Sequence, residues 1–179
     1  ASLREFRVWR AQEMGRGLAK AGITGMYERA YELASGGLVS RTHFARALVE
    51  LGYANNVSQV FKKYLVNNKP GHVTGKWATL ENALDWIHTA GGQAVIAHPA
   101  RYRMTRSKLR QLIQDFVDCG GQAIEVVSGS HSRDDMFTIA QHARDFNLLA
   151  SAGSDYHGPE HTWMDLGKLP ALPDGCTPV

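Results

Sequence analysis

Residues 91–99 read GGQAVIAHP, residues 120–127 read GGQAIEVV and residues 148–158 read LLASAGSDYHG. Each contains a short apolar run of the kind that forms a buried strand, and the first two follow a glycine pair that suits the end of a helix. Helices are predicted before the three strands, over residues 80–92, 108–119 and 136–146. Three helix-to-strand units in about eighty residues predict an α/β fold, with a parallel sheet or barrel covered by helices.

The first 75 residues have a different pattern, which predicts helices. Apolar residues recur at helical spacing from Leu3 to Leu18, from Met26 to Leu33 and again after Ser40. Ser58 is a candidate N-cap for a further helix, and the earliest extended stretch is expected at residues 71–74. We therefore expect three parts: residues 1–20 as a lead-in helix, 21–75 as a helical insertion and 76–179 as the sheet-bearing part.

The composition is that of a chain that folds around a core. Of its 179 residues, 44% are hydrophobic and 21% are charged, which suits one domain, alone or with an insertion. No apolar run approaches the ~20 residues of a membrane helix, and the first residues lack a signal-peptide layout, so we expect a cytoplasmic protein without a membrane partner. Cys119 and Cys176 lie far apart and outside any CxxC pattern, which argues against a disulfide scaffold and a cysteine zinc site.

Polar residues occur within or just after each predicted strand. His98 ends the first strand, Glu125 lies in the second, and Asp155 and His157 follow the third. Because catalytic groups gather at the C-terminal ends of parallel strands, these four residues are candidates for one metal site. Carboxylate and imidazole ligands suit Mn, Zn, Fe or Mg. In an extended segment, residues 155 and 157 would point the same way and face one cation.

Each of these residues also has a structural interpretation. An isolated histidine such as His98 is often a hydrogen-bonded core residue, and Glu125 can be an ion-pair partner. Asp155 and His157, after Gly153, can belong to an ordinary capped turn. The occurrence of AHP at one strand end and GSDYH at another favours the site over the turn.

The three stretches, in this order and at this spacing, resemble the later half of the PHP (polymerase and histidinol phosphatase) family. Residues 40–52 (SRTHFARALVELG), 60–73 (VFKKYLVNNKPGHV) and 77–83 (W-x-T-L-E-N-A) resemble a subgroup with a helical insertion. Members of that subgroup act as nucleotide phosphatases and 5′-to-3′ exonucleases on short oligonucleotides. The resemblance implies the later part of a distorted (β/α)7 TIM-like barrel with its site at the C-terminal rim.

The resemblance also implies the ligands and the cofactor. His98, Asp155 and His157 match the family's metal ligands, and Glu125 matches a glutamate that is either a ligand or its neighbour. A complete site would hold about two or three divalent ions, which would polarise a phosphate oxygen and activate a water. Mn²⁺ is the expected ion, and Zn²⁺, Fe²⁺ and Mg²⁺ are the alternatives.

The sequence departs from the family in one respect. The family begins with an H-x-H pair and adds an aspartate, a glutamate and a further histidine on later strands. No H-x-H occurs here. We therefore expect a fragment that is inactive alone and whose partner is the missing N-terminal barrel segment.

Basic residues of the insertion are candidates for substrate binding, and they are Arg41, His43, Arg46, Lys62 and Lys63. As a lid they would bind a second phosphate, the arginines bidentately and the lysines as point charges, while Tyr64, Trp77 and Tyr102 could stack a base. The alternative is an ordinary solvated helix surface.

The predicted function is metal-dependent hydrolysis of 3′,5′-bisphosphate nucleotides or short oligonucleotides. The alternative is a non-catalytic nucleic-acid or nucleotide-binding module. A net charge of +3 and a pI near 9.0 suit an anionic ligand in both cases, and they also suit a slightly basic surface without function.

Overall fold

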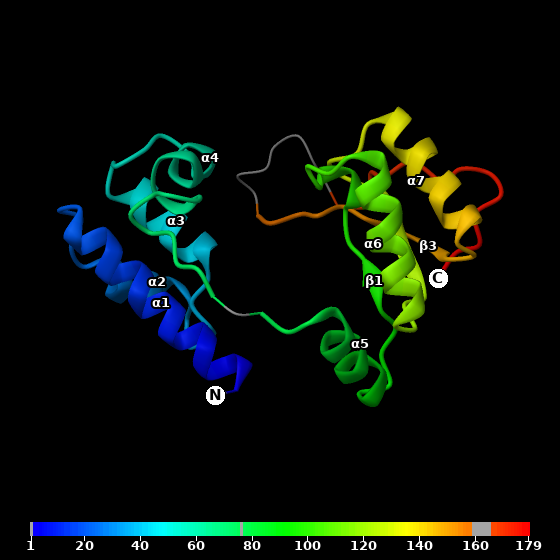
Figure 1. Ribbon diagram of the computed structural model, residues 1–179. Helices are drawn as coiled ribbons and strands as arrows, with labels where there is room; N and C mark the ends of the chain where they lie inside the picture. The colour runs from blue at the N-terminus through cyan, green and yellow to red at the C-terminus, as the bar shows by residue number, and fades with distance from the viewer. Residues whose placement is uncertain (1, 76, 159–165) are drawn as a thin grey trace. The chain divides into compact units, whose positions relative to one another are not determined.

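The structure, a computed structural model, describes residues 2–75, 77–158 and 166–179 (Figure 1). The chain forms two compact units, Ala1–Trp77 and Ala78–Val179, and each has a hydrophobic core of its own. We call them the helical unit and the sheet unit.

The helical unit is built from four α-helices and one π-helical turn among its described residues. They are α1 (Leu3–Lys20), α2 (Met26–Leu33), α3 (Arg41–Glu50), α4 (Val57–Val60) and the π-helix η1 (Phe61–Leu65). Apolar residues at helical spacing form its core, with Leu18, Phe44 and Leu48 fully buried at the centre. The sequence pattern therefore predicted this part correctly as helical.

Two details of the helical unit differ from the prediction. Asn56, not Ser58, caps α4, because the Asn56 side chain accepts the N–H of Gln59 at 2.9 Å. Residues 71–74 form no strand. Instead, the N–H of Gly71 binds the carbonyl of Tyr64 at 2.7 Å. A Cβ on Gly71 would lie 2.7 Å from the Leu65 side chain, so this segment packs against the helical core.

The sheet unit alternates helices with parallel strands. Its elements are α5 (Leu80–Thr89), β1 (Val95–Ile96), the 3₁₀ turn η2 (Pro99–Arg101), α6 (Arg106–Asp118), β2 (Ala123–Ser128), α7 (Arg133–Asp145) and β3 (Leu149–Gly153). The strands lie in the order β1-β2-β3, and both pairings are parallel. The predicted α/β fold with a small parallel sheet is thus confirmed. β1 is shorter than expected because His98 turns to a left-handed φ of 34° before Pro99 begins η2.

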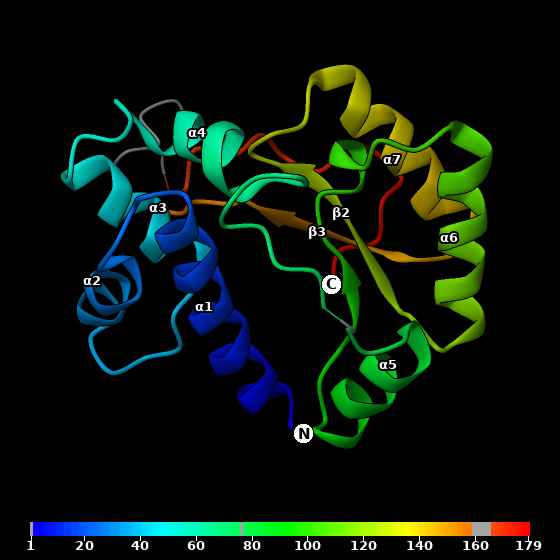
Figure 2. The same ribbon diagram turned by 60° about the vertical axis from the view of Figure 1, so that its left-hand side comes forward.

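Helices α6 and α7 lie together on one side of the sheet (Figures 1 and 2). Ile113 and Phe116 of α6 and Ile139 of α7 share a buried cluster with the apolar residues of β2. All six residues of β2 are buried, as expected of a central parallel strand. The last residues of the chain add to β3, since the N–H of Ala150 binds the carbonyl of Thr177 at 2.7 Å.

Within the described residues, no helix combines the length and the apolar character needed to cross a membrane.

Candidate functional site

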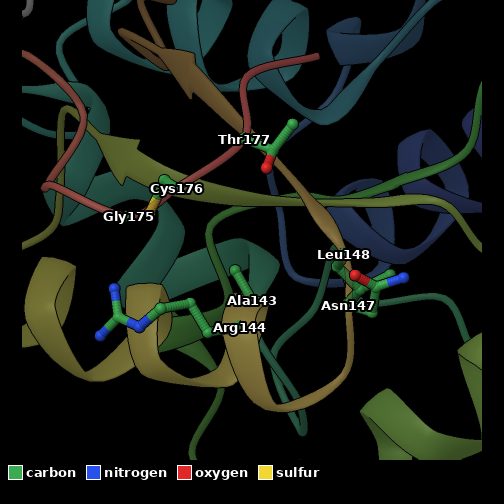
Figure 3. A pocket seen from close by; sticks show the side chains of 7 residues that line it. All are labelled: Ala143, Arg144, Asn147, Leu148, Gly175, Cys176 and Thr177. Atoms are coloured by element: carbon green, nitrogen blue, oxygen red, sulfur yellow. The ribbon is translucent and has the colours of Figure 1, made fainter.

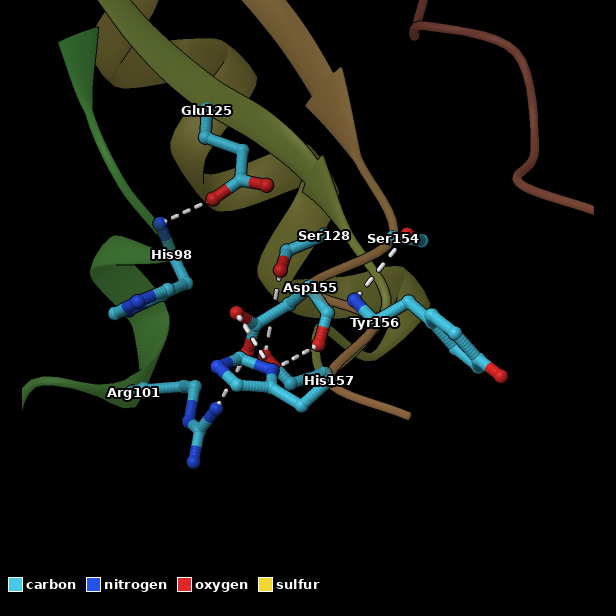
Figure 4. A network of polar contacts seen from close by, with 9 residues as sticks. His98, Arg101, Glu125, Ser128, Ser154, Asp155, Tyr156 and His157 are labelled. Carbon is cyan, nitrogen blue, oxygen red and sulfur yellow. Dashed lines mark hydrogen bonds and ion pairs between the residues drawn. The ribbon is translucent and has the colours of Figure 1, made fainter. Parts of the chain in front are cut away.

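The C-terminal ends of the three parallel strands bring polar side chains to one edge of the sheet. His98 and Arg101 follow β1, Glu125 lies in β2, and Asp155 and His157 follow β3. Figure 4 shows these five side chains in one neighbourhood. We call them the strand-end cluster.

Glu125 ties the cluster together across two strands. Its Oε2 accepts the backbone N–H of His98 at 2.5 Å, and the residue is only 8% exposed. A Cβ on Gly153 would lie 2.6 Å from Oε1 of Glu125. Gly153 ends β3 and leaves room for the buried carboxylate.

His98 has a strained backbone and an unused ring nitrogen. Its φ of 34° lies in the left-handed region, which is uncommon for a residue other than glycine. Its Nδ1 is buried and has no hydrogen-bond partner among the described residues. The rings of His98 and Tyr102 meet edge to face, and their centroids lie 6.1 Å apart. Burial and then the charge of Glu125 raise the pKa of Tyr102, which keeps this phenol neutral.

Asp155 and His157 approach each other by a turn and not along a strand. Asp155 has a φ of 53°, so the prediction of an extended segment is wrong at this position. The turn brings Nδ1 of His157 to 2.6 Å from the carbonyl oxygen of Asp155 and to 3.7 Å from its Oδ1. The other carboxylate oxygen, Oδ2, accepts a hydrogen bond from Nη1 of Arg101 at 2.7 Å.

A divalent first-row cation needs several nitrogen or oxygen ligands around one point. The orphaned Nδ1 of His98 and the Asp155 carboxylate, which is already paired with a cationic group, have the chemistry of first-row metal ligands. Within residues 2–75, 77–158 and 166–179, however, no three His, Cys, Asp or Glu side chains are arranged to hold a metal ion. His98 and Asp155 therefore fit part of the ligand set of a metal site.

Two polar residues at this edge were not among the predicted site residues. Arg101 pairs with Asp155. Its position three residues after His98 was the feature of the sequence that could have identified it. His131 follows β2 and is 7% exposed; its Nδ1 lies 3.0 Å from the carbonyl of Val126, and its Nε2 has no partner among the described residues. A carbonyl only accepts, so Nδ1 is the protonated nitrogen. The signal for His131 was its place just after a predicted strand.

The five predicted substrate-binding residues all belong to the helical unit, and they are Arg41, His43, Arg46, Lys62 and Lys63. Arg41 and both lysines are exposed. His43 already has a structural role, because its Nδ1 accepts the N–H of Ser40 at 3.1 Å in a capping box for α3. Burial and then the charge of Arg46 lower the pKa of His43, so it is the neutral ring that caps the helix. Substrate binding by these residues stays a prediction.

A small cavity of about 180 Å³ lies at the opposite end of the sheet unit (Figure 3). It is formed by the last turn of α7, the residues that lead into β3 and the chain near Cys176, and none of the predicted site residues lines it. Sites for drug-sized ligands are usually about 300–1,000 Å³, so this cavity is too small for a nucleotide.

The chain is similar to enzymes that act on nucleotides and RNA. It is 49% identical over 179 residues to the 3′,5′-nucleoside bisphosphate phosphatase of Chromobacterium violaceum, a match of 99% of this chain and 63% of that protein. It is 45% identical over 175 residues to the 5′-3′ exoribonuclease Rnm of Escherichia coli, a match of 98% of this chain and 59% of that protein. No family model matches.

Solved structures agree with this similarity. An amidohydrolase structure from C. violaceum, with bound sulfate and no metal, has a TM-score of 0.91 at 48% identity and covers 98% of this chain. A proposed metal-dependent phosphoesterase from Bifidobacterium adolescentis has a TM-score of 0.77 over 92% of the chain at 22% identity, which supports the fold alone. This chain spans 61% and 58% of these two structures, and about the same share of the curated relatives.

Proposed function

We propose that this chain, which is similar to a 3′,5′-nucleoside bisphosphate phosphatase and to a 5′-3′ exoribonuclease, belongs to the PHP family and supplies part of the active site of a metal-dependent phosphoesterase. The proposed substrates are 3′,5′-bisphosphate nucleotides and short oligonucleotides, since the relatives are named a 3′,5′-nucleoside bisphosphate phosphatase and a 5′-3′ exoribonuclease. The observation that carries the proposal is the strand-end cluster, which places the residues of the AHP and GSDYH motifs at one edge of the sheet.

We propose that the three strands are the later part of a distorted barrel, as in the resemblance drawn from the sequence. In that arrangement His98, Asp155 and His157 would hold divalent cations, with Mn²⁺ as the expected ion. Further ligands, which this chain does not carry, would complete the site. Bound cations would supply Lewis acidity for a phosphate oxygen and a water that ionises near neutral pH.

Glu125 acts as a positioning residue in this proposal. Its Oε2 already accepts the N–H of His98, and that bond supports the left-handed backbone that holds the His98 ring. A carboxylate in this role stabilises the ring orientation of its neighbour, as residues behind a metal ligand commonly do.

Arg101 is the residue of this chain best suited to bind the scissile phosphate. Its side chain is 54% exposed, and its partner Asp155 is one of the proposed ligands. If Asp155 held a cation, the Arg101 guanidinium would be free of its present partner and could bind two phosphate oxygens in a bidentate manner.

The test is phosphate release from adenosine 3′,5′-bisphosphate in Mn²⁺, with a longer protein that contains this chain and the remaining family ligands. His98→Asn and Asp155→Asn should each lower kcat by about a hundredfold or more, because a metal ligand is lost. His88→Asn is the control, since His88 is an exposed histidine at the end of α5. Equal activity in all three variants would refute the proposal.

A second candidate is a nucleotide-binding module without catalysis. The absence of a three-ligand group within the described residues favours it. It predicts salt-dependent binding of oligonucleotides without any metal-dependent phosphate release from the longer protein.

A further inference from the structure

The charges of the chain are unevenly divided between its two units. Residues 1–77 hold 12 Lys and Arg against 5 Asp and Glu, a net charge of +7. Residues 78–179 hold 8 against 12, a net charge of −4, and the two values add to the +3 of the whole chain. The mild overall charge therefore conceals a strongly basic helical unit, which attracts anions to itself.

Three arginines of this unit lie close together without acidic partners. Arg7 and Arg10 lie three residues apart on α1 and share a face of that helix, and Arg41 begins α3. Among the described residues none of the three forms an ion pair. Burial, and then the charges of Arg41 and Arg7, lower the pKa of Arg10, so the positive charges repel one another at this place.

Two of these guanidinium groups lie over aromatic rings. Cζ of Arg10 lies 5.2 Å from the centroid of Trp77, and Cζ of Arg41 lies 5.6 Å from that of Phe61. A guanidinium over a ring keeps its N–H groups at the edge of its plane, where a phosphate can accept two of them. The Nε of Arg10 is buried and has no partner among the described residues, so an incoming anion breaks no hydrogen bond of that nitrogen.

Aromatic surface adjoins the three arginines. Trp77 is 53% exposed and contacts Phe6 of α1 edge-on, with the ring centroids 5.4 Å apart. Gly75 permits this arrangement, because a Cβ there would lie 2.0 Å from the Phe6 ring. Exposed indole beside arginines is the combination that binds single-stranded nucleic acid, since bases stack on the rings and phosphates bind the guanidinium groups.

We propose that Arg7, Arg10, Arg41 and Trp77 form a binding site on the helical unit for the backbone and one base of a single-stranded oligoribonucleotide. The proposal deepens the proposed function and rests on it only for the choice of RNA. It assigns strand binding to a surface that needs no metal. An acidic protein would satisfy the arginines equally well but would gain little from the exposed indole, which is why an oligonucleotide is the occupant.

The experiment measures binding of a 5′-fluorescein-labelled single-stranded octaribonucleotide to the full chain by fluorescence anisotropy, in EDTA and at several salt concentrations. Arg7→Gln, Arg10→Gln and Arg41→Gln should each weaken binding about tenfold and reduce the salt slope by about 0.7–1. Trp77→Leu should weaken binding about fivefold or more and leave the salt slope unchanged, because stacking releases no counterions.

Arg16→Gln is the matched control, because Arg16 lies on the same helix and is paired with Glu13. Arg7 is exposed, so its variant tests the site without disturbing the core. If Arg7→Gln and Arg10→Gln bind like Arg16→Gln, the site does not exist. Phosphate release in Mn²⁺ is assayed separately, with a longer protein that contains this chain and the remaining family ligands. Binding that follows this pattern without phosphate release by that longer protein would reject the proposed catalysis and keep the site, and release without the pattern would do the reverse.

Discussion

Nη1 of Arg101 lies 2.7 Å from Oδ2 of Asp155, so a carboxylate proposed to bind metal already has a cationic partner within the same edge of the sheet. The Asp155 side chain is 19% exposed and the Arg101 side chain 54%. An arginine and a divalent cation would compete for the same oxygen, and this competition can be measured.

Arg101→Gln is expected to raise the affinity for Mn²⁺ by about two- to fivefold, because a partly exposed ion pair contributes up to about 1 kcal/mol. The affinity can be followed by electron paramagnetic resonance of free Mn²⁺. Arg103→Gln, an exposed arginine of the same loop, removes the same charge without touching Asp155. Equal affinities for the two variants would show that the ion pair does not compete with metal.

Gly153→Ala is expected to lower the free energy of unfolding by about 1–3 kcal/mol, because the new methyl group would overlap the Glu125 carboxylate. The measurement is urea denaturation followed by circular dichroism. In a Glu125→Ala background the same change should cost much less, since the overlapping atoms are gone. An equal cost in both backgrounds would contradict the close approach of these two residues.

The buried side chain of His142 is expected to make the protein less stable in mild acid. It is 2% exposed, neither ring nitrogen has a partner in the described part of the chain, and its pKa is lowered by burial and then by Arg110. Arg106 of α6 acts in the same direction, whereas Asp145 of α7 raises the pKa and offsets part of the effect. Because the folded pKa lies below the unfolded value, stability is full above about pH 6.5 and falls as the pH drops from there to the folded pKa.

Replacing this histidine should remove that pH dependence. His142→Leu is expected to flatten the decline in the free energy of unfolding between about pH 6.5 and 5, which for one group is at most about 1.4 kcal/mol per pH unit. Urea denaturation across this range provides the measurement, and His88→Leu, at an exposed position, serves as the control. A decline as steep as that of the wild type would place its origin in other groups.

Arg41→Ala is expected to raise KM for a 3′,5′-bisphosphate nucleotide more than KM for a simple phosphate monoester. The difference corresponds to a loss of about 1.5–3 kcal/mol of binding free energy. The assay needs a longer protein that is catalytically active. Arg29→Ala is the control, because Arg29 is already paired with Glu32 and Glu50. Unchanged kinetics on both substrates in an Arg41 and Lys62 double variant would refute substrate binding by this surface.

The 179-residue chain alone is expected to have no useful phosphoesterase turnover. A catalytic metal needs a nearly complete set of protein ligands, and the described residues bring no three together. The purified chain should therefore release little phosphate in Mn²⁺, and adding the N-terminal third of a relative in trans should restore some release. Turnover at the rate of a full-length relative, abolished by His98→Ala, would overturn this expectation.

The order of the elements could be predicted from the sequence because the periodic pattern is strong. The helices from Leu3 and Met26, and the apolar strand that contains Glu125, follow directly from spacing and from the glycine pairs. The C-terminal ends of parallel strands meet by necessity, so the shared edge of His98, Glu125 and Asp155 was also predictable.

The local geometry of the site was not predictable from pattern. Periodicity reports burial and does not report backbone conformation, so the left-handed φ of Asp155 gave no sign in the sequence. The pairing of Arg101 with Asp155 joins residues 54 positions apart, and the role of Gly153 depends on a side chain in the neighbouring strand. Such relationships exist only after the sheet has formed.

The two separate cores have an evolutionary consequence. Leu18 and Phe44 stabilise one unit, whereas Ile113 and Ile124 stabilise the other, and substitutions at distant, independent sites have additive effects. Substitutions in the helical unit should therefore leave the stability of the core beneath the strand-end cluster unchanged. A library of variants at exposed positions of residues 1–77 should consequently keep the sheet unit folded, so the oligonucleotide site proposed for the helical unit can be varied by selection without loss of the second core.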